Sequence, residues 1–593
     1  MSHMTRPVFA AIALLTSIHA VRATELDAPA SRPSAPPPDR FVYVSANLLV
    51  DTEVSRVESI IDRAAAAGYT GVVLADSKFC RLADMPDKYF AHARRVRAAA
   101  QAKHIEIVPC VFPIGYSGDL LSRDPNLAEA IPVQDAVFIV KNSGASLQPE
   151  PGVSLPAGDM SDPRAWAWHD DTITFENGVA TSRDPRGRNA RIVAKPITLA
   201  PHRQYHVWTK VRTREYEGTP EIKVFAPRGA GQEAASLSFS SLGCKPTQDW
   251  TTHHIVFNSL GFTSVNLYFG CWDGSTGELS WDDAGIEEVG LLNVVRRAGA
   301  PLTVEIEPPA PAGAPSTSAP STGTPSTGTK PPASAVQTIA RTPLLEGADF
   351  KPVADPRMGT IPWPGGYEVY HQPPAIELLK PLPDGTRLRV SYSHAITIHD
   401  DQVMICPSEP KTTDLLRDQA VRVNALWSPN AFWMSHDEIR CLNHDQSCRS
   451  RNLTPGRILA ENVKTCTAIL REISPAARLY VWSDMFDPFH NARDDYYLVR
   501  GDLAGAWEGL DKDIIIACWY FDKRADSMAF FAQRGNPILI AGYYDGPPGA
   551  GVAQAAGWLA AVPHAAALRG VMYTTWERRY EDLEPFAAAA WKR

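Results

Sequence analysis

The sequence lacks an internal apolar run long enough to cross a lipid bilayer, and it lacks long runs of one charge. Its 58 lysines and arginines against 66 aspartates and glutamates give a formal net charge of -8. Because a transmembrane helix needs about 20 consecutive apolar residues, we expect no membrane span. Because no basic stripe is available to neutralise phosphates, we do not expect nucleic acid as a partner.

The N-terminus carries one short apolar run, Val8 to Leu15, with a basic residue before it and small residues after it. The run is too short to cross a bilayer, so it predicts a secretory signal peptide over residues 1–23. A flexible leader over 24–40 and a secreted or periplasmic location follow from that prediction. The alternative is a disordered or expression-derived leader, since residues 1–4 resemble an expression scar.

Cysteine is scarce and odd in number: nine in 593 residues, which leaves at least one thiol unpaired. An exported protein permits disulfides. The best candidates are Cys441 with Cys448, which bracket a short loop, and Cys244 with Cys271, which lie on neighbouring strand-like segments. A zinc site on Cys441, His444 and Cys448 is the weaker alternative because the spacing is not a standard one. We therefore expect no metal and no cofactor.

Strand-like and helix-like segments alternate at the start of the chain. Three runs, 41–46, 71–75 and 105–112, are predicted strands. Runs that are apolar throughout and separated by helices indicate a parallel sheet covered on both faces. A single core supports roughly 250 to 300 residues, so this first barrel part, over 41–142, is expected to be followed by other domains.

The alternation stops at residue 143. Residues 143–290 hold short strand-like runs without helical periodicity, which indicates an antiparallel β-sandwich. These segments resemble jelly-roll carbohydrate-binding modules that end in a Trp-Asp-Asp strand, so tryptophans there could stack on sugars; packing in the core is the alternative for most of them. Residues 291–400 are predicted to form a small β unit with a disordered Pro, Ser and Thr-rich loop, 308–335; an interdomain linker is the alternative for that loop.

The alternation resumes over 401–593. Three predicted strands before the β segments and five after them make eight, the number that closes a (β/α)8 barrel. The predicted fold class is α/β: a TIM barrel interrupted after strand 3 by an antiparallel, jelly-roll β-sandwich. The five later strands are 432–435, 479–482, 514–519, 538–542 and 571–576.

Carboxylates and aromatic rings gather at the carboxyl ends of these strands, where barrel enzymes keep their active sites. Cleavage of a glycosidic bond needs a carboxylic acid to protonate the leaving oxygen and an anionic group to stabilise the oxocarbenium-like transition state. Filling the barrel is the alternative for Trp482 and Trp519. It is less expected for Asp437 and Glu438, because unpaired carboxylates are costly to bury. The strand-end residues are Asp76, Tyr116, His436, Asp437, Glu438, Trp482, Asp484, Trp519, Tyr543, Asp545, Trp576 and Glu577.

The order of these strand ends resembles that of the family 20 glycoside hydrolases, the β-N-acetylhexosaminidases. The motifs that carry the resemblance lie over roughly 407–577 and read FWMSHDEI, YVWSDM, ACW, AGYYD and TTWE; EIVPCVFPIGYS is a weaker match to the family's third strand. The chain lacks the family's usual arginine after strand 1, its Pro-Gly-His on strand 3 and its N-terminal α/β domain.

The resemblance implies an exo-acting, retaining hydrolase that removes terminal β-linked N-acetylhexosamine from an oligosaccharide or glycoconjugate. In that scheme the 2-acetamido oxygen of the substrate attacks the anomeric carbon. Glu438 would be the general acid and then base, Asp437 would orient the acetamido group, and Tyr543 would hydrogen-bond its oxygen. The other strand-end residues would contact the substrate: Trp482, Trp519 and Trp576 as walls of the acetamido pocket, Glu577 at the sugar hydroxyls, and His436, Asp484, Asp545, Asp76 and Tyr116 around them.

Two rival functions stay open. One is a glycosidase on a sugar without an acetamido group, with Glu438 as acid and Asp484, Asp545 or Asp437 as nucleophile or base. The other is a glycan-binding protein whose barrel has no catalytic activity.

Overall fold

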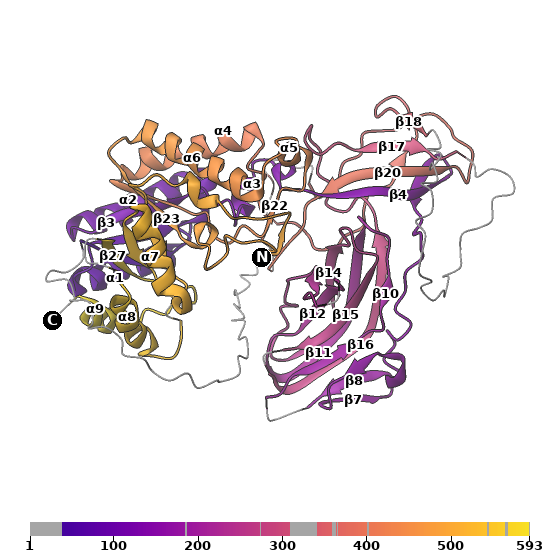
Figure 1. Cartoon of the computed structure of the whole chain (residues 1–593), viewed down its shortest axis with the longest axis horizontal. Helices are drawn as coiled ribbons and strands as arrows, with labels where there is room; N and C mark the ends of the chain where they lie inside the picture. Colours follow the sequence, from indigo (N-terminus) through magenta and orange to yellow (C-terminus); the bar gives the residue numbers. More distant parts are fainter. Residues whose placement is uncertain are drawn as a thin grey trace, which may run out of the picture.

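The computed structural model describes residues 38–591, except 184–186, 230, 273, 309–340, 359–362, 364–365, 400–401, 543–544 and 564–566. The predicted signal peptide, most of the leader, nearly all of the loop 308–335, and Tyr543 lie outside the described residues. Figure 1 shows a barrel with its helices on one side, and a small sheet and a two-layered β-sandwich on the other.

Eight parallel strands form a closed barrel in which strand order follows chain order. Each strand coincides with one of the predicted apolar runs, so the predicted number and order of barrel strands are confirmed. The strands are β1 (Asp39–Ser45), β2 (Gly71–Ala75), β3 (Glu106–Val111), β21 (Ala431–Met434), β23 (Arg478–Trp482), β25 (Ile515–Cys518), β26 (Ile538–Ile540) and β27 (Leu568–Tyr573).

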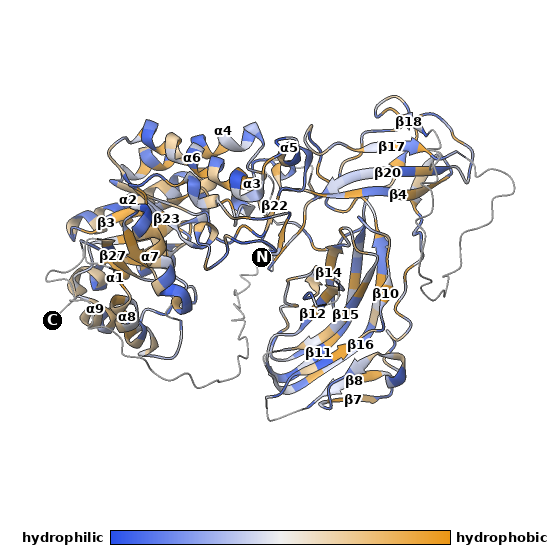
Figure 2. Cartoon of the chain, viewed as in Figure 1, coloured by the Kyte–Doolittle hydropathy of each residue, from blue (hydrophilic) through white to orange (hydrophobic). Residues whose placement is uncertain are grey.

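Side chains of each barrel strand alternate between the barrel interior and the helix layer. On β21, Ala431 and Trp433 pack inside the barrel, whereas Phe432 and Met434 pack beneath the helices. Because both faces are buried, the strand is apolar at every position. In Figure 2 the helices around the barrel carry both hydrophilic and hydrophobic residues, as expected for helices with one solvated face.

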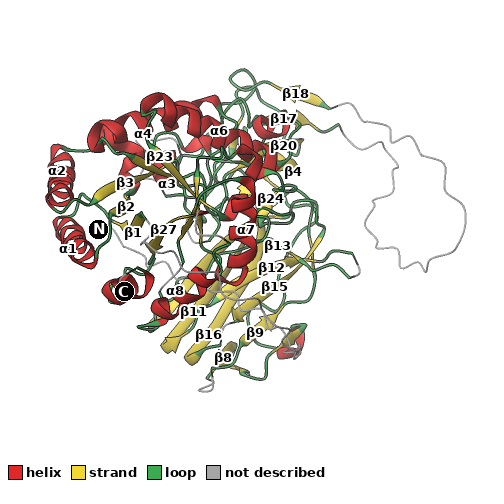
Figure 3. Ribbon diagram, turned by 60° about the vertical axis from the view of Figure 1, so that its left-hand side comes forward, coloured by secondary structure: helices red, strands yellow, loops and turns green. Residues whose placement is uncertain are grey.

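Helices cover the outside of the barrel (Figure 3). The regular (β/α)8 alternation is incomplete, because the helices that the structure describes between β23 and β25 are short 3-10 helices, among them η5 (Ala506–Gly509). No helix in the described ranges is both long and apolar enough to span a bilayer. The α-helices are α1 (Asp51–Ala67), α2 (Asp87–Ala102), α3 (Gly118–Leu121), α4 (Pro410–Trp427), α5 (Gln446–Arg449), α6 (Pro455–Ile473), α7 (Arg524–Arg534), α8 (Ala550–Ala560) and α9 (Leu583–Ala590).

Local sequence signals set the helix ends. Helix α6 begins at Pro455, and the hydroxyl of Thr454 accepts a hydrogen bond from the N–H of Arg457 at 3.2 Å, as a capping residue followed by proline predicts. Helix α1 ends at Gly68, whose φ of 86° lies in the left-handed region. Glycine adopts that conformation at no steric cost.

The sandwich consists of two antiparallel sheets that enclose a core of their own. Trp166 and Trp281 lie in this core, which fits the packing alternative for these two, whereas Trp168 is 48% exposed. One sheet contains β13 (Ala235–Ser236), β12 (Glu221–Ala226), β15 (Ser264–Cys271), β9 (Ala190–Val193), β6 (Trp168–His169) and β10 (Ile197–Thr198). The other contains β14 (Gln248–Asn258), β11 (Gln204–Glu217), β16 (Thr276–Val289), β8 (Val179–Ser182) and β7 (Ile173–Glu176).

A third antiparallel sheet joins segments from before and after the sandwich. Its strand β4 pairs with β20 from Ile131 to Ile139, although the sequence placed this run in the barrel part 41–142. Pairing with a segment about 250 residues away is not visible in the periodicity of either strand. The sheet contains β18 (Thr342–Leu344), β17 (Thr303–Ile306), β20 (Arg387–His394), β4 (Ile131–Lys141), β5 (Gly144–Leu147) and β19 (Ile376–Glu377); β22 (Cys441–Leu442) and β24 (Leu498–Val499) form a separate pair.

The predicted disulfides are wrong, because all nine cysteines are free. The Sγ atom of Cys244 lies 3.5 Å from Nε2 of His253, and the thiol of Cys271 donates to the carbonyl of Gly274 at 3.2 Å. Neither the short loop between Cys441 and Cys448 nor the neighbouring strand-like segments of Cys244 and Cys271 led to a disulfide bond.

Candidate active site at the carboxyl ends of the barrel strands

The turn after β21 presents Asp437 and Glu438 at the carboxyl end of the barrel. Glu438 has a φ of 49°, a left-handed conformation that costs a residue with a Cβ about 1–2 kcal/mol. Gly115, in the loop after β3, packs against this turn so closely that a Cβ there would lie 1.9 Å from the carbonyl oxygen of Asp437. The strained turn is therefore enclosed by a loop that requires glycine.

A cation and a phenol hold the carboxylate of Glu438. Tyr116 donates its hydroxyl to Oε2, and Nη2 of Arg440 lies 2.8 Å from Oε1. Arg440 is 3% exposed; it also donates to Oε1 of Gln402 at 2.5 Å, and its guanidinium lies over the ring of Tyr497. Both oxygens of the Glu438 carboxyl group are thus held by side chains of the site.

Asp437 is in the opposite electrostatic situation. It is half-buried, and burial together with the nearby carboxylates of Asp484 and Glu438 raises its pKa well above the usual range. Burial and like charge both favour the protonated form of a carboxyl group. The two adjacent carboxyls thus lie in different surroundings: Glu438 contacts a guanidinium and a phenol, whereas Asp437 lies near two other carboxyl groups.

Asp484 supports the turn from the neighbouring strand. It is fully buried at the start of η4 (Asp484–Phe486), directly after β23. It accepts hydrogen bonds from the N–H of Glu438 at 2.8 Å, the amide of Asn491 at 3.0 Å and the indole of Trp519 at 3.3 Å. Burial raises the pKa of Asp484 to about 7. Its geometry is that of a residue that positions Glu438.

Aromatic rings line the barrel interior beside these carboxyls. Tyr43 makes edge contacts with Trp482 and Trp576 at centroid distances of 5.9 and 4.8 Å. Trp482 is only 3% exposed, which fits the alternative that it fills the barrel. Trp519 and Trp576 keep some exposure, so they are the tryptophans of this set that can present a ring face to a ligand.

His436 lies away from the carboxyls, contrary to its predicted place in a substrate site. It is completely buried, and its Nε2 lies 3.0 Å from Oδ1 of Asn462 on α6. Burial lowers its pKa to about 4. The reason is strand alternation: His436 continues the outward-facing series of Phe432 and Met434, toward the helices.

Asp76, Asp545 and Glu577 have local partners. Asp76 accepts from the N–H groups of Leu48 and Lys78, each at 3.0 Å, and from the hydroxyl of Tyr89 at 2.9 Å. Asp545 accepts from the hydroxyl of Thr575 and from the N–H groups of Trp576 and Glu577, at 2.6 and 3.2 Å. Glu577 is exposed and pairs with Arg579 at 2.6 Å. The first two carboxylates brace loops, and Tyr543 lies outside the described residues.

The sequence interpretation missed Arg440, Gln402 and Asn491. Arg440 had a usable signal, because it follows Glu438 by two residues in the same loop. Gln402 and Asn491 come from irregular segments, where neither spacing nor periodicity distinguishes a site residue from a surface amide.

Comparisons with known proteins do not place the chain in a family. No family model and no curated protein matches it. Among solved structures, a rhamnosidase from Novosphingobium sp. PP1Y matches 91% of this chain and 55% of its own, with 11% identity and a TM-score of 0.29. A β-N-acetylhexosaminidase from Bacteroides fragilis matches 33% of this chain and 42% of its own, with 12% identity and a TM-score of 0.23. A family 29 carbohydrate binding module matches 23% of this chain and 92% of its own, with 12% identity and a TM-score of 0.18.

Proposed function

We propose that the protein is a glycoside hydrolase, acting outside the cytoplasm, that removes a terminal amino sugar from an oligosaccharide or glycoconjugate. The observation that carries the proposal is the pair Asp437 and Glu438 at the barrel's carboxyl end, where Glu438 contacts Arg440 and where burial and nearby carboxylates raise the pKa of Asp437. Glycosidic cleavage requires a proton donor and a carboxylate or equivalent at the anomeric centre. The partly exposed side chains of Trp519 and Trp576 supply apolar surface that suits a pyranose.

In the substrate-assisted mechanism, the acetamido oxygen of the substrate forms the bond to the anomeric carbon. Glu438 then protonates the leaving oxygen and later deprotonates water, while Asp437 orients the acetamido group. For Glu438 to act as acid, its contact with Arg440 at 2.8 Å must loosen when substrate binds, because a proton donor is a neutral carboxyl group and does not form an ion pair with a guanidinium.

A second candidate follows from that same contact. If Arg440 stays on Glu438, Asp437, whose pKa is raised by burial and nearby carboxylates, is the proton donor and Glu438 the nucleophile or base, and no acetamido group is needed. Asp484 is a poorer choice of nucleophile because its oxygens already accept three hydrogen bonds.

The test is a panel of aryl glycosides with and without the 2-acetamido group, assayed on wild type, Glu438→Gln and Asp437→Asn. Hydrolysis of acetamido sugars alone, lost in Glu438→Gln, supports the substrate-assisted mechanism. The leaving group separates the roles: the variant that lacks the general acid keeps activity on dinitrophenyl glycosides and loses it on poor leaving groups. No hydrolysis of any glycoside by the wild type would leave only a glycan-binding role.

A further inference from the structure

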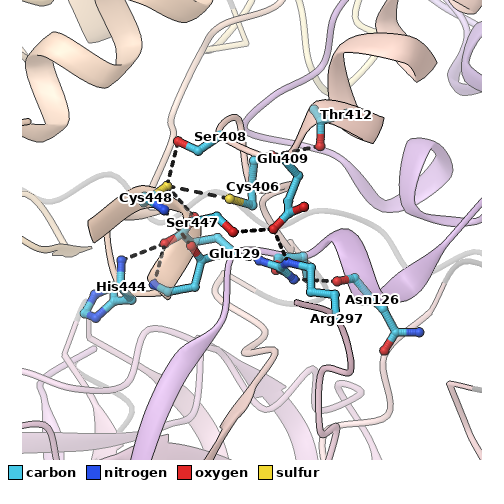
Figure 4. Close-up of polar contacts among 12 residues, drawn as sticks. Asn126, Glu129, Arg297, Cys406, Ser408, Glu409, Thr412, His444, Ser447 and Cys448 are labelled. Atoms are coloured by element: carbon cyan, nitrogen blue, oxygen red, sulfur yellow. Dashed lines mark hydrogen bonds and ion pairs between the residues drawn. The ribbon is translucent and has the colours of Figure 1, made fainter. Parts of the chain in front are cut away.

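Four buried ligand-type side chains meet where the chain leaves the barrel and returns to it. The Glu129 carboxylate, the thiols of Cys406 and Cys448, and the Asp445 carboxylate each place one ligand atom within 4.8 Å of the others. All four residues are at most 1% exposed. Figure 4 shows Glu129, Cys406 and Cys448 pointing toward one another from separate segments. None of them belongs to the candidate active site.

The separations fit a tetrahedral metal site. The two Sγ atoms are 3.6 Å apart, and Sγ of Cys448 lies 3.3 Å from Oε2 of Glu129. Zinc bonds of about 2.3 Å to sulfur and 2.1 Å to oxygen, at tetrahedral angles, place two sulfurs about 3.8 Å apart and a sulfur and an oxygen about 3.6 Å apart. The sulfurs are too far apart for a disulfide, whose S–S distance is about 2.05 Å.

The cluster holds more carboxylate groups than nearby cations that could pair with them. Glu129 is buried, yet among the described residues its carboxylate accepts hydrogen bonds only from the N–H groups of His444 and Asp445 and from the Cys448 thiol. Arg297 is already paired with Asp445 and with Glu409. Buried carboxylates are costly unless they are paired or coordinate a metal. A divalent ion would pair Glu129 and ionise the two thiols.

Two arginines lie next to the ligands and offset part of the charge that such an ion would leave; each also pairs with a further carboxylate, Arg297 with Glu409 and Arg451 with Glu461. Two thiolates and two carboxylates around a divalent ion carry a net charge of about -2 in the ligand shell. Arg297 contacts Asp445, and Arg451 donates to Ser408 at 2.9 Å, whose hydroxyl lies 3.1 Å from Sγ of Cys448. These partners also fix the orientation of the ligands, as outer-shell groups do in metal sites.

We propose that Glu129, Cys406, Asp445 and Cys448 bind one structural zinc ion that ties the barrel to the segments leading into the small sheet. Four protein ligands close the coordination shell, which is the arrangement of structural zinc rather than catalytic zinc. The site departs from the sequence-based expectation of no metal. It also differs from the alternative zinc site on Cys441, His444 and Cys448, since the Nε2 of His444 lies 2.6 Å from the carbonyl of Leu498.

The test measures metal in the full chain without a histidine tag, after incubation with zinc and exhaustive dialysis. Elemental analysis should give one zinc per chain in the wild type, and none in a Cys406→Ser, Cys448→Ser double variant. Glu129→Gln, which keeps the shape of the side chain, should weaken zinc binding by about tenfold or more. Cys466→Ser is the matched control, because Cys466 is also completely buried but lies on α6 outside the cluster.

Cobalt(II) provides a second readout, since two thiolate ligands give a sulfur-to-cobalt charge-transfer band in the wild type and in Cys466→Ser. That band should be absent from the double variant. Nine reactive thiols in the denatured wild type with no retained metal would overturn the proposal. A count of two fewer reactive thiols would also overturn the proposal, because it would mean that Cys406 and Cys448 form a disulfide. Zinc retained equally by Glu129→Gln would remove that residue from the ligand set and overturn the four-ligand site.

Discussion

Asp484 accepts a hydrogen bond from the backbone N–H of Glu438 at 2.8 Å, and Glu438 has a left-handed backbone. The acceptor lies at the end of β23 and the donor in the loop after β21, so the bond joins two adjacent strand ends. A residue in a strained conformation persists only where its surroundings hold it. The hydrogen bond to Asp484 stabilises this conformation, and the direction of the Glu438 side chain depends on that bond.

Asp484→Asn should lower kcat for glycoside hydrolysis by about 10- to 100-fold, with a smaller change in KM. An amide offers one acceptor oxygen where the carboxylate offers two, so it cannot serve Glu438, Asn491 and Trp519 together. Outer-shell partners of catalytic groups have effects of this size in metal sites. Steady-state kinetics on an aryl glycoside hydrolysed by the wild type measures the change.

Asp487→Asn is the control for that variant. Asp487 is also completely buried in the same loop, but it accepts from the N–H of Phe489 at 2.9 Å and has no bond to Glu438. Equal losses of kcat in the two variants would indicate a general effect of the loop and contradict the positioning role.

Arg440→Met should lower the free energy of unfolding by about 1–3 kcal/mol at pH 7, because it leaves the Glu438 carboxylate without its cation. Combining it with Glu438→Gln should recover part of the loss, since coupled neighbours deviate from additivity by about 0.5–3 kcal/mol. Chemical denaturation of the single and double variants gives the coupling energy.

Arg417→Met serves as the reference for an exposed ion pair. Arg417 contacts Glu472 at 2.6 Å on the surface of the barrel helices, and exposed pairs contribute about 0–1 kcal/mol. A coupling near zero for Arg440 and Glu438 would show that the contact does not hold the carboxylate.

The sequence predicted the barrel strands well because a strand buried on both faces must be apolar at nearly every position, and that pattern is local. The sequence predicted contacts poorly where a side chain could face either the barrel interior or the helices, and where segments distant in the sequence meet. His436 stands beside Asp437 in the sequence, yet alternation turns it toward Asn462. Cys448 stands in a predicted disulfide with Cys441, but the cysteine that lies beside it is Cys406, 42 residues away in the sequence. Pairings over such separations depend on the folded topology, which no spacing rule encodes.

Gly115→Ala should abolish or strongly reduce hydrolysis. The added Cβ would lie 1.9 Å from the carbonyl oxygen of Asp437 and 3.1 Å from that of Glu438, so the carboxyl-bearing turn must move. A misplacement of about 1 Å can cost a hundredfold in rate. Kinetics of the purified variant measures the loss, and circular dichroism verifies that the fold is retained.

Gly144→Ala is the matched control, because its nearest neighbours would lie at 3.6 and 3.8 Å, which is ordinary contact. It should retain wild-type activity. A fully active Gly115→Ala would mean that the turn tolerates displacement and that the Asp437 and Glu438 geometry is not what the reaction requires.

The pH dependence of the unfolding free energy should reveal the raised pKa of the buried Asp484 carboxyl group. Burial raises its pKa to about 7 in the folded protein, against an ordinary value of 3.8. Between these values the folded state holds a proton that the unfolded state releases, so stability falls as pH rises, by at most about 1.4 kcal/mol per pH unit. Asp484→Asn lacks this contribution. The Tm of the variant should therefore rise relative to that of the wild type as the pH increases from 5 to 7, when thermal unfolding is followed at matched ionic strength.

Glu508→Gln should show no such trend over that range, because Arg534 lowers the pKa of Glu508 from its usual value. A Tm difference between Asp484→Asn and wild type that stays constant with pH would mean that Asp484 is already ionised in the folded protein at pH 5.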